Sequence, residues 1–197
     1  MRMDFNTPGI PDEAFARRPG IPMTKQEVRA ISLAKLQLFP GAVVYDIGAG
    51  TGSMAIECRR LVEPGRVFAI ESNPEAVDLI KLNSYRFTVQ LDLVPGSAPE
   101  VLDILPEADR IFIGGSGGDI EAMIIGCDRK LKPGGILVMN TVTLYTAPLA
   151  CQALERLGYE LQAVQVNIAV NEKRGRARIW QARNPVTIIS GRKGEQF

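Results

Sequence analysis

The sequence contains no histidine among its 197 residues. This absence excludes Ser-His-Asp triads, histidine metal ligands and histidine acid–base catalysis. Cysteine is also scarce, and its three copies, Cys58, Cys127 and Cys151, are widely spaced. An odd number of scattered cysteines predicts reduced thiols rather than a disulfide framework or a metal clip. We therefore predict neither a metal site nor a disulfide-stabilised fold.

An excess of charge of one sign and long hydrophobic runs are missing as well. The formal net charge is +1, so no broad basic field favours a nucleic-acid partner. No apolar run approaches the length of about 20 residues that a membrane helix needs. The N-terminus carries acids and prolines, unlike a signal peptide. We expect a cytoplasmic protein without nucleic-acid or membrane partners, and its apolar content of 46% is that of an ordinary globular domain.

What is present is an alternation of short apolar runs with helical patterns. Residues 1–22 are rich in proline and glycine and predict an extended arm, ahead of one domain over residues 23–197. Short β-branched strands that alternate with helices imply βαβ units, hence an α/β fold whose mostly parallel sheet carries helices on both faces. Two extended runs near the end, joined by a polar turn at 171–175, predict a β-hairpin whose last strand enters antiparallel. We expect strands at 42–47, 67–71, 88–94, 109–113 and 136–140, helices at 24–38, 54–61, 74–83, 119–131 and 148–157, and hairpin strands at 161–170 and 178–183.

A glycine-rich loop follows the first predicted strand, and Asp46 precedes it by two residues. The loop lies at the carboxyl end of that strand, where open α/β sheets bind ligands. Glycine permits unusual backbone angles there and lets backbone N–H groups approach a ligand closely. Glu71 ends the second strand, where a carboxylate can accept hydrogen bonds from both hydroxyl groups of a ribose. We call Gly48, Ala49, Gly50, Thr51 and Gly52 the glycine loop.

Two classes of ligand suit this layout. The dinucleotide fingerprint spaces its glycines as G-x-G-x-x-G, whereas this loop has G-x-G-x-G. The acid Asp46 would repel a pyrophosphate but attract the ammonium and sulfonium groups of S-adenosylmethionine. We therefore predict S-adenosylmethionine as the cofactor, bound by Asp46, the glycine loop and Glu71. A nucleotide-binding redox module, a tight turn without a ligand, and an Asp46 that caps backbone N–H groups are the alternatives.

Other loops at the same edge of the sheet are expected to contact ligands. Ser97 and Ala98 follow the third strand, where adenine contacts fall in this fold, although a simple turn is the alternative. The fourth strand leads to a loop with Gly114, Gly115 and Ser116. This loop lacks the Asn/Asp-Pro-Pro-aromatic motif typical of methyltransferases that act on amino nitrogens. It suggests backbone close to a bulky or anionic substrate, or else a flexible linker.

Thr24 begins a segment, Thr24-Lys25-Gln26-Glu27, that has the spacing of a capping box. This spacing predicts that the Thr24 side chain caps the helix that follows.

Two further segments point to one family. Pro22-Met23-Thr24-Lys25-Gln26-Glu27-Val28 and the ending Asn184-Pro185-Val186, together with the glycine loop and the string Gly9 to Phe15, resemble the CbiT family over nearly the whole chain. Members of this family are decarboxylating methyltransferases of cobalamin biosynthesis. The resemblance implies a Rossmann-like class I methyltransferase fold with a seven-stranded sheet. It also implies methylation at C15 of a cobalt-precorrin and loss of carbon dioxide from the C12 acetate.

The resemblance also implies site residues and partners. It assigns Thr24, the glycine loop, Glu71 and Ala98 to the S-adenosylmethionine site. It implies a homotetramer and a stand-alone enzyme, with C5 methylated by a separate protein. A tetrapyrrole with many carboxylates needs cations, for which Arg174 and Arg176 in the hairpin turn are candidates, and Tyr145 could stack on the macrocycle. Solvated turn charges and ordinary packing are the alternatives for these residues, and a methyltransferase for tRNA, protein carboxylates or another small molecule is the alternative function.

Overall fold

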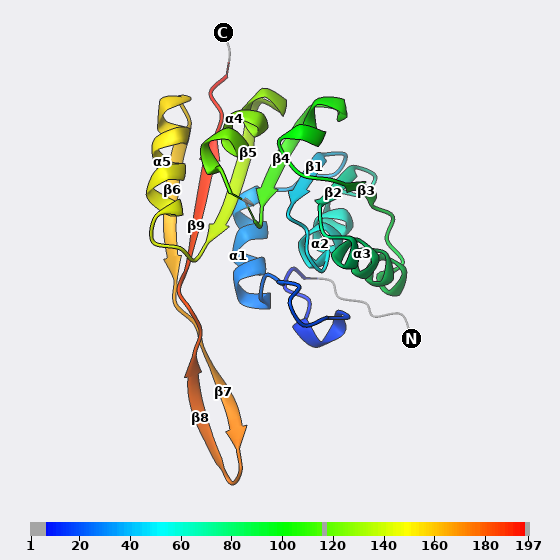
Figure 1. Cartoon of the computed structure of the whole chain (residues 1–197), viewed down its shortest axis with the longest axis vertical. Coiled ribbons are helices and arrows are strands. Elements are labelled where there is room, and N and C mark those ends of the chain that lie inside the picture. Colours follow the sequence, from blue (N-terminus) through cyan, green and yellow to red (C-terminus); the bar gives the residue numbers. More distant parts are fainter. Residues whose placement is uncertain (1–6, 116–117, 196–197) are drawn as a thin grey trace.

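The computed structural model describes residues 7–115 and 118–195. A central seven-stranded sheet lies between two layers of helices, and a two-stranded ribbon extends away from one end of it (Figure 1). The predicted α/β fold with helices on both faces is therefore confirmed. Within the described residues, no helix combines the length and the apolar character needed to cross a membrane. Cys58, Cys127 and Cys151 are all unpaired, and the first two are buried.

The sheet has the strand order β3-β2-β1-β4-β5-β9-β6. The pairs among the first five strands are all parallel, whereas β9 runs antiparallel to both β5 and β6. The order reverses between β1 and β4, which makes the carboxyl ends of these strands the topological switch point where open α/β sheets bind ligands. The strands are β1 (Val43–Ile47), β2 (Arg66–Glu71), β3 (Asp92–Pro95), β4 (Ala108–Ile113), β5 (Leu131–Thr141), β6 (Glu160–Val166) and β9 (Val186–Arg192).

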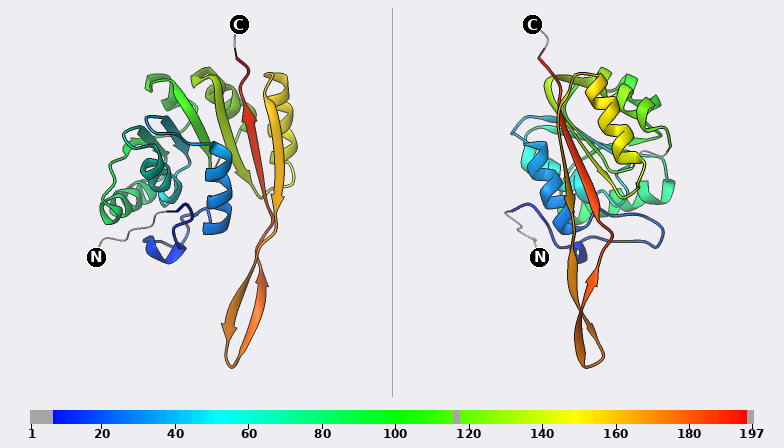
Figure 2. Two further views of the ribbon diagram at one scale, coloured as in Figure 1. Left: turned by 180° about the vertical axis from the view of Figure 1, so that it is seen from behind. Right: turned by 90° about the vertical axis from the view of Figure 1, so that its left-hand side faces the viewer.

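The helices cover the two faces of the sheet, because successive strand residues face opposite ways. On β1, Val44 packs in a buried cluster with Val28 and Met54, whereas Tyr45 packs in another cluster with Met123. Figure 2 shows the two layers with the sheet between them. One layer holds α1 (Gln26–Leu36), α2 (Ser53–Val62) and α3 (Pro74–Phe87). The other holds α4 (Ile120–Lys130) and α5 (Thr146–Arg156) with the short 3₁₀ turn η2 (Glu100–Ile104). A second 3₁₀ turn, η1 (Asp12–Ala14), lies in the N-terminal arm.

Several predicted boundaries are wrong, among them the start of β5, which lies at Leu131 and not at residue 136. Helix α1 begins at Gln26 with Lys25 at the N-cap, and no side chain caps it, so the predicted capping role of Thr24 is not observed. Helix α3 continues to Phe87, and Thr88 ends it in the left-handed conformation with φ 53°. The strand predicted from residue 88 therefore begins only at Asp92. For α1, α3 and β3 the predicted type of element is right, and tertiary packing sets where each element begins or ends.

The predicted C-terminal hairpin is more elaborate in the structure. Strand β6 pairs with β9 in the main sheet, and the chain between them forms a separate ribbon of β7 (Ala169–Arg174) and β8 (Ala177–Ala182). The turn at its tip consists of Gly175 and Arg176, shorter than the predicted turn over 171–175. The antiparallel strand of the main sheet is β9, whose residues were not predicted as a strand, whereas the predicted last strand at 178–183 lies in the ribbon. The predicted pairing of 161–170 with 178–183 is therefore right only for β7 and β8. The partner of β6 was missed because strand pairing across 20 residues leaves no local signal.

The described part of the N-terminal arm, residues 7–22, packs on the domain. Ile10 and Phe15 are 1% and 3% exposed and form a small core with Ile56 and Phe87. The Phe15 and Phe87 rings lie 4.8 Å apart between centroids. The arm thereby covers α2 and α3 next to the glycine loop.

Candidate functional site

The glycine loop joins the end of β1 to the start of α2 at the switch point of the sheet. Gly48, Gly50 and Gly52 all have positive φ, at 70°, 54° and 76°. A Cβ on Gly48 would lie 2.9 Å from the backbone of Gly115, and one on Gly50 would lie 2.6 Å from the Pro22 carbonyl. The glycines are required because the chain's own backbone approaches from two sides. Sequence reasoning assigned this close approach to a ligand and did not predict Pro22 beside the loop.

Glu71 holds the loop from the neighbouring strand. Its Oε2 accepts a hydrogen bond from the Gly50 N–H at 2.8 Å, and its Oε1 accepts one from the Asn73 N–H at 2.9 Å. The side chain is half-buried. A carboxylate has about four acceptor positions, so these two bonds leave room for two hydroxyl groups.

Asp46 is 1% exposed, beneath the loop. Its Oδ2 accepts a hydrogen bond from the Ala55 N–H at 2.8 Å, which confirms the alternative that it caps backbone N–H groups. Burial raises the pKa of Asp46 to about 7; the bond from Ala55 opposes the shift and the charge of Glu71 adds to it. Among the described residues, its Oδ1 has no hydrogen-bond partner, and neither has the buried Thr51 Oγ1. Two orphaned oxygens at one loop are what a site with an unfilled polar or cationic partner would leave.

A narrow cavity of about 60 Å³ opens beside the loop. Gly48, Glu71, Ser97, Ala98 and Gly115 contribute to its wall, with Met123 as an apolar side. Five of the ten described residues that line this cavity had been predicted from the sequence as ligand contacts. The structure therefore brings together the ends of β1, β2 and β3 and the loop after β4.

A larger cavity of about 540 Å³ lies against α1 and the ends of β4 and β5. Its wall is mostly apolar, and it includes Thr24 and Gly114, which were predicted to touch ligands. None of the described lining residues is acidic, whereas Lys25 and Arg183 are cationic. Arg183 also pairs with Glu27 at 2.8 Å. Gly114 lines the larger cavity, and its neighbour Gly115 lines the narrow one.

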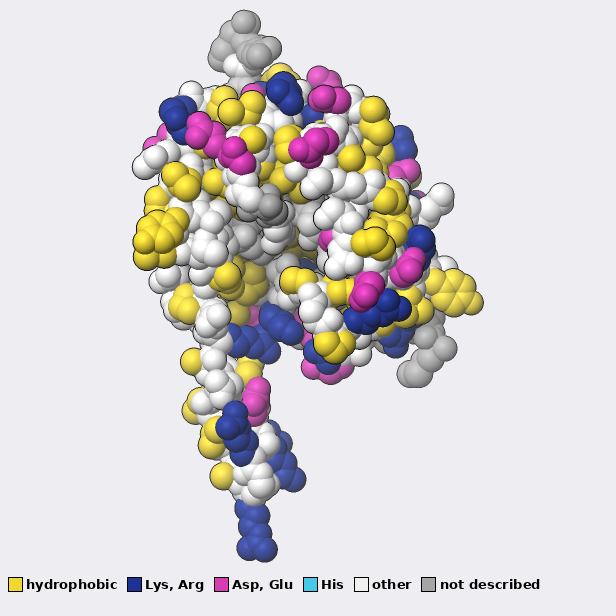
Figure 3. Space-filling view, in the orientation of Figure 1, with side chains coloured by type: hydrophobic (Ala, Val, Ile, Leu, Met, Phe, Trp, Pro, Cys, Tyr) yellow, Lys and Arg dark blue, Asp and Glu magenta, His cyan; other side chains and the backbone are white. Residues whose placement is uncertain are grey.

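Other predicted residues lie elsewhere. Arg174 and Arg176 lie at the tip of the β7–β8 ribbon, where Lys and Arg side chains gather away from the body of the protein (Figure 3). Tyr145 is 76% exposed before α5, and it lines neither cavity. Ser116 lies outside the described residues.

Sequence reasoning missed two polar residues near the loop. Asn83 is fully buried on α3 and donates to the Thr51 carbonyl at 2.8 Å. Arg29 is fully buried on α1 and pairs with Glu57 and Asp12. A signal was available, because each is a polar residue on the buried face of a predicted helix, and such residues need partners.

Comparisons with known proteins agree on one family. The sequence model of a family described as "precorrin methyltransferase domain" matches residues 13–193, which include the glycine loop and every strand of the sheet. A curated relative from Pyrobaculum calidifontis, named "Probable cobalt-precorrin-6B C(15)-methyltransferase (decarboxylating)", is 42% identical over 193 residues, covering 96% of this chain and 98% of the relative.

Solved structures are similar over the same range. A crystal structure from Geobacter metallireducens, described as a precorrin-6y C5,15-methyltransferase, has a TM-score of 0.87 at 44% identity, over 94% of this chain and 96% of that chain. That of a precorrin-8W decarboxylase from Methanobacterium thermoautotrophicum has a TM-score of 0.87 at 34% identity, over 92% of this chain and 98% of that chain.

Proposed function

Because the chain belongs to the precorrin methyltransferase domain family, we propose that it uses S-adenosylmethionine to methylate C15 of cobalt-precorrin-6B. The same enzyme removes carbon dioxide from the C12 acetate, as a step of cobalamin biosynthesis. The observation that carries the proposal is the pair of cavities beside the glycine loop, one lined by Gly114 and the other by its neighbour Gly115. The narrow cavity, with Glu71, Ser97 and Ala98 in its wall, suits the adenine end of a nucleoside, and the larger cavity suits a large, partly apolar anion.

The glycine loop and its neighbours fit S-adenosylmethionine, which supplies an activated methyl group when bound. Glu71 keeps free acceptor positions for the two ribose hydroxyls, and Ser97 and Ala98 line the recess that would hold the adenine. The recess of about 60 Å³ is far below the 300–1,000 Å³ of a typical ligand cleft, so the rest of the cofactor extends along the glycine loop. Asp46 and Thr51 offer buried oxygens there. Thr24 contributes from the wall of the larger cavity.

The larger cavity fits a tetrapyrrole that carries carboxylates. Its apolar wall, with Met23, Val142 and Ile168, suits the face of a macrocycle, while Lys25 and Arg183 suit peripheral carboxylates. The ring carbons of a reduced tetrapyrrole are enamine-like nucleophiles, so the protein's contribution is alignment rather than a strong base. An apolar wall beside the C12 acetate would also favour loss of its carboxyl group.

Arg174 and Arg176 can contact a substrate only if the ribbon reaches the cavity of another subunit. The ribbon tip projects away from the sheet and helices of its own chain (Figure 1), and Arg174 and Arg176 line neither cavity. The exposed Tyr145, before α5, likewise lines neither cavity of its own chain. Contact with a substrate therefore requires a second subunit, which agrees with the homotetramer that the family resemblance implies. Location in the cytoplasm and a separate C5-methyltransferase as pathway partner belong to the same proposal.

Turnover tests the proposal directly. The full chain is incubated with a cobalt-precorrin-6B-type substrate and S-adenosylmethionine, and the product is weighed by mass spectrometry. We expect gain of one methyl group together with loss of one carbon dioxide. Gain of a methyl group alone would refute the decarboxylating half. An unchanged tetrapyrrole, with a thermal shift by NAD(P)H and none by S-adenosylhomocysteine, would favour a redox module instead.

A further inference from the structure

Asn83 is a fully buried polar residue in the middle of the apolar face of α3. Its neighbours on that face, Leu79, Ile80 and Phe87, are all buried hydrophobic residues. A buried amide is costly unless its polar atoms are hydrogen-bonded. Its hydrogen bonds must therefore account for its presence.

The Asn83 amide joins two segments that are distant in sequence. Its Oδ1 accepts a hydrogen bond from the Ala16 N–H at 2.7 Å, and its Nδ2 donates to the Ala16 carbonyl at 3.1 Å. The same Nδ2 donates to the Thr51 carbonyl at 2.8 Å. Ala16 belongs to the N-terminal arm, and Thr51 belongs to the glycine loop. An amide in this orientation satisfies all three groups, because two carbonyls need a donor and one N–H needs an acceptor.

The arm runs from Ala16 across the glycine loop. The Pro22 carbonyl lies so close to Gly50 that an added Cβ would be 2.6 Å away. Beyond it, the Thr24 carbonyl accepts a hydrogen bond from the buried Arg29, whose Nε pairs with Glu57 on α2 at 2.5 Å. The segment from Ala16 to Thr24 is therefore held by Asn83 at its start and by Arg29 at its end, and Pro22 lies against Gly50 between these two points.

We propose that Asn83 is a positioning residue for cofactor binding. It links the arm to the Thr51 carbonyl and so holds the glycine loop in the conformation that binds the cofactor. Coupling between two sites is reciprocal, so bound cofactor also holds the arm in place. This inference rests on the proposed S-adenosylmethionine site, and Asn83 itself touches neither cavity.

Limited proteolysis measures attachment of the arm. Arg17 and Arg18 follow Ala16 and are exposed, and trypsin cleaves after Arg17 because Pro19 protects the bond after Arg18. Saturating S-adenosylhomocysteine should slow this cleavage in the unmodified protein about tenfold. The variants Asn83→Asp and Asn83→Leu should be cut faster, should lose the protection, and should bind S-adenosylhomocysteine about tenfold more weakly by calorimetry.

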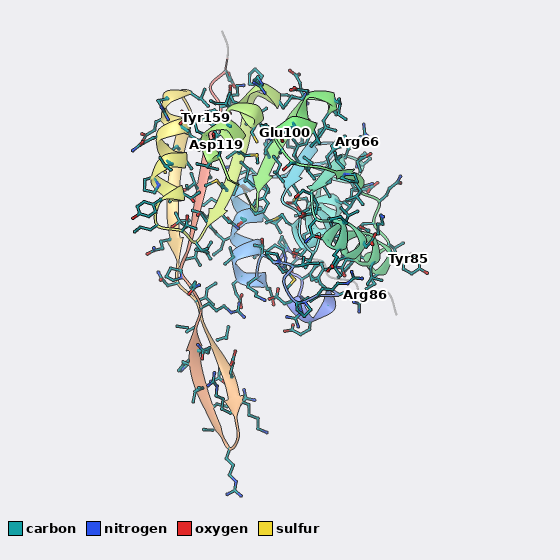
Figure 4. All side chains as sticks on the ribbon, in the orientation of Figure 1. Arg66, Tyr85, Arg86, Glu100, Asp119 and Tyr159 are labelled. Carbon is teal, nitrogen blue, oxygen red and sulfur yellow. The ribbon has the colours of Figure 1, made fainter. Side chains whose placement is uncertain are left out.

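Two control variants separate positioning from general destabilisation. Ser84→Ala removes a hydrogen bond to the Ile80 carbonyl at 2.8 Å, one residue away on the same helix. Tyr159→Phe removes a bond to Asp128 at 2.8 Å, on the side of the molecule opposite α3 (Figure 4). Both should retain the cofactor affinity of the unmodified protein, whatever their melting temperatures.

The outcomes distinguish the inference from the function on which it rests. If the unmodified protein binds S-adenosylhomocysteine but is cleaved at an unchanged rate, the inference is wrong and the proposed function stands. The same conclusion follows if the Asn83 variants bind with unchanged affinity. If the unmodified protein does not bind S-adenosylhomocysteine at all, the proposed function fails and the inference fails with it.

Discussion

The N-terminal arm and the β7–β8 ribbon are both polar, extended segments, but the structure uses them in opposite ways. The arm buries Ile10 and Phe15 and is fixed by the fully buried Arg29 and Asn83. All six residues of β8 are exposed, including Trp180 at 73%. An isolated two-stranded ribbon is marginal in water, whereas the arm is part of the core. The polarity of an extended segment therefore does not show whether the segment packs on the core. This depends on the distant residues that the segment contacts.

The largest effect is expected at the ion pairs that hold the arm. Arg29→Met removes the guanidinium that pairs with the buried carboxylate of Glu57 and leaves Asp12 its longer pair with Lys25 at 3.8 Å, which costs about 3–5 kcal/mol of unfolding free energy. Urea unfolding measures the change. The control is Arg66→Met, which breaks an exposed pair with Asp92 and should leave stability unchanged. Equal losses in the two variants would contradict the account of the arm.

The buried acid under the glycine loop should make stability depend on pH. The raised pKa of Asp46 means that the folded state keeps a proton which the unfolded state has released, so stability falls as pH rises from about 4 to about 7. Asp46→Asn should remove this fall and gain about 4 kcal/mol at pH 8. It should also weaken S-adenosylmethionine binding more than S-adenosylhomocysteine binding, because only the former carries a sulfonium.

The control for the acid is Asp78→Asn on α3, whose side chain is 65% exposed. It should leave both the pH profile and the ratio of the two affinities unchanged. An Asp46→Asn protein with the original pH profile would show that Asp46 is ionised at low cost in the fold.

Alanine substitutions at one glycine of the loop and one of the ribbon allow a direct comparison of the two segments. Gly50 and Gly175 have similar φ values of 54° and 62°, but only Gly50 has a backbone atom within 3 Å of an added Cβ. Gly175→Ala should cost about 1 kcal/mol from the left-handed conformation alone. Gly50→Ala should cost about 2–3 kcal/mol and abolish binding of S-adenosylhomocysteine in calorimetry. A similar loss of stability in the two variants would mean that the Pro22 backbone shifts at little cost to accommodate a Cβ at Gly50.

The smallest effects should come from the cations. Lys25→Gln in the larger cavity should raise the KM for the tetrapyrrole about tenfold and leave S-adenosylhomocysteine affinity unchanged. Arg174→Gln with Arg176→Gln should raise the same KM only if a second subunit receives the ribbon. Steady-state kinetics with cofactor titration separates the two. An unchanged KM in the ribbon variant would remove these arginines from the substrate site.

Much of the fold and part of the site followed from local patterns. The alternation of strands and helices gave the parallel sheet, and the position of Glu71 at the end of β2 placed it beside the loop. These predictions succeed because strand periodicity and the topology of βαβ units fix which strand ends meet. Ser97 and Ala98, which line the narrow cavity, could be predicted for the same reason, because they follow the end of a strand of the parallel sheet.

The remainder depends on contacts between distant residues. Thr24 has the spacing of a cap, but its carbonyl accepts a bond from Arg29 and its side chain does not cap α1. In the sequence, Asn83 looks like an ordinary helix residue, because its hydrogen-bond partners Ala16 and Thr51 are distant along the chain. Likewise, β6 pairs with β9 only because the ribbon folds out between them. No local pattern encodes these partners, although a polar residue on an apolar helix face signals that one exists.

A crystal structure with S-adenosylhomocysteine tests the central claim most directly. The account predicts ribose hydroxyls within hydrogen-bonding distance of the Glu71 carboxylate, the adenine beside Ser97 and Ala98, and the sulfur facing the larger cavity. A ligand bound away from the glycine loop, or a pyrophosphate that occupies residues 48–52 in crystals grown with a dinucleotide, would contradict it.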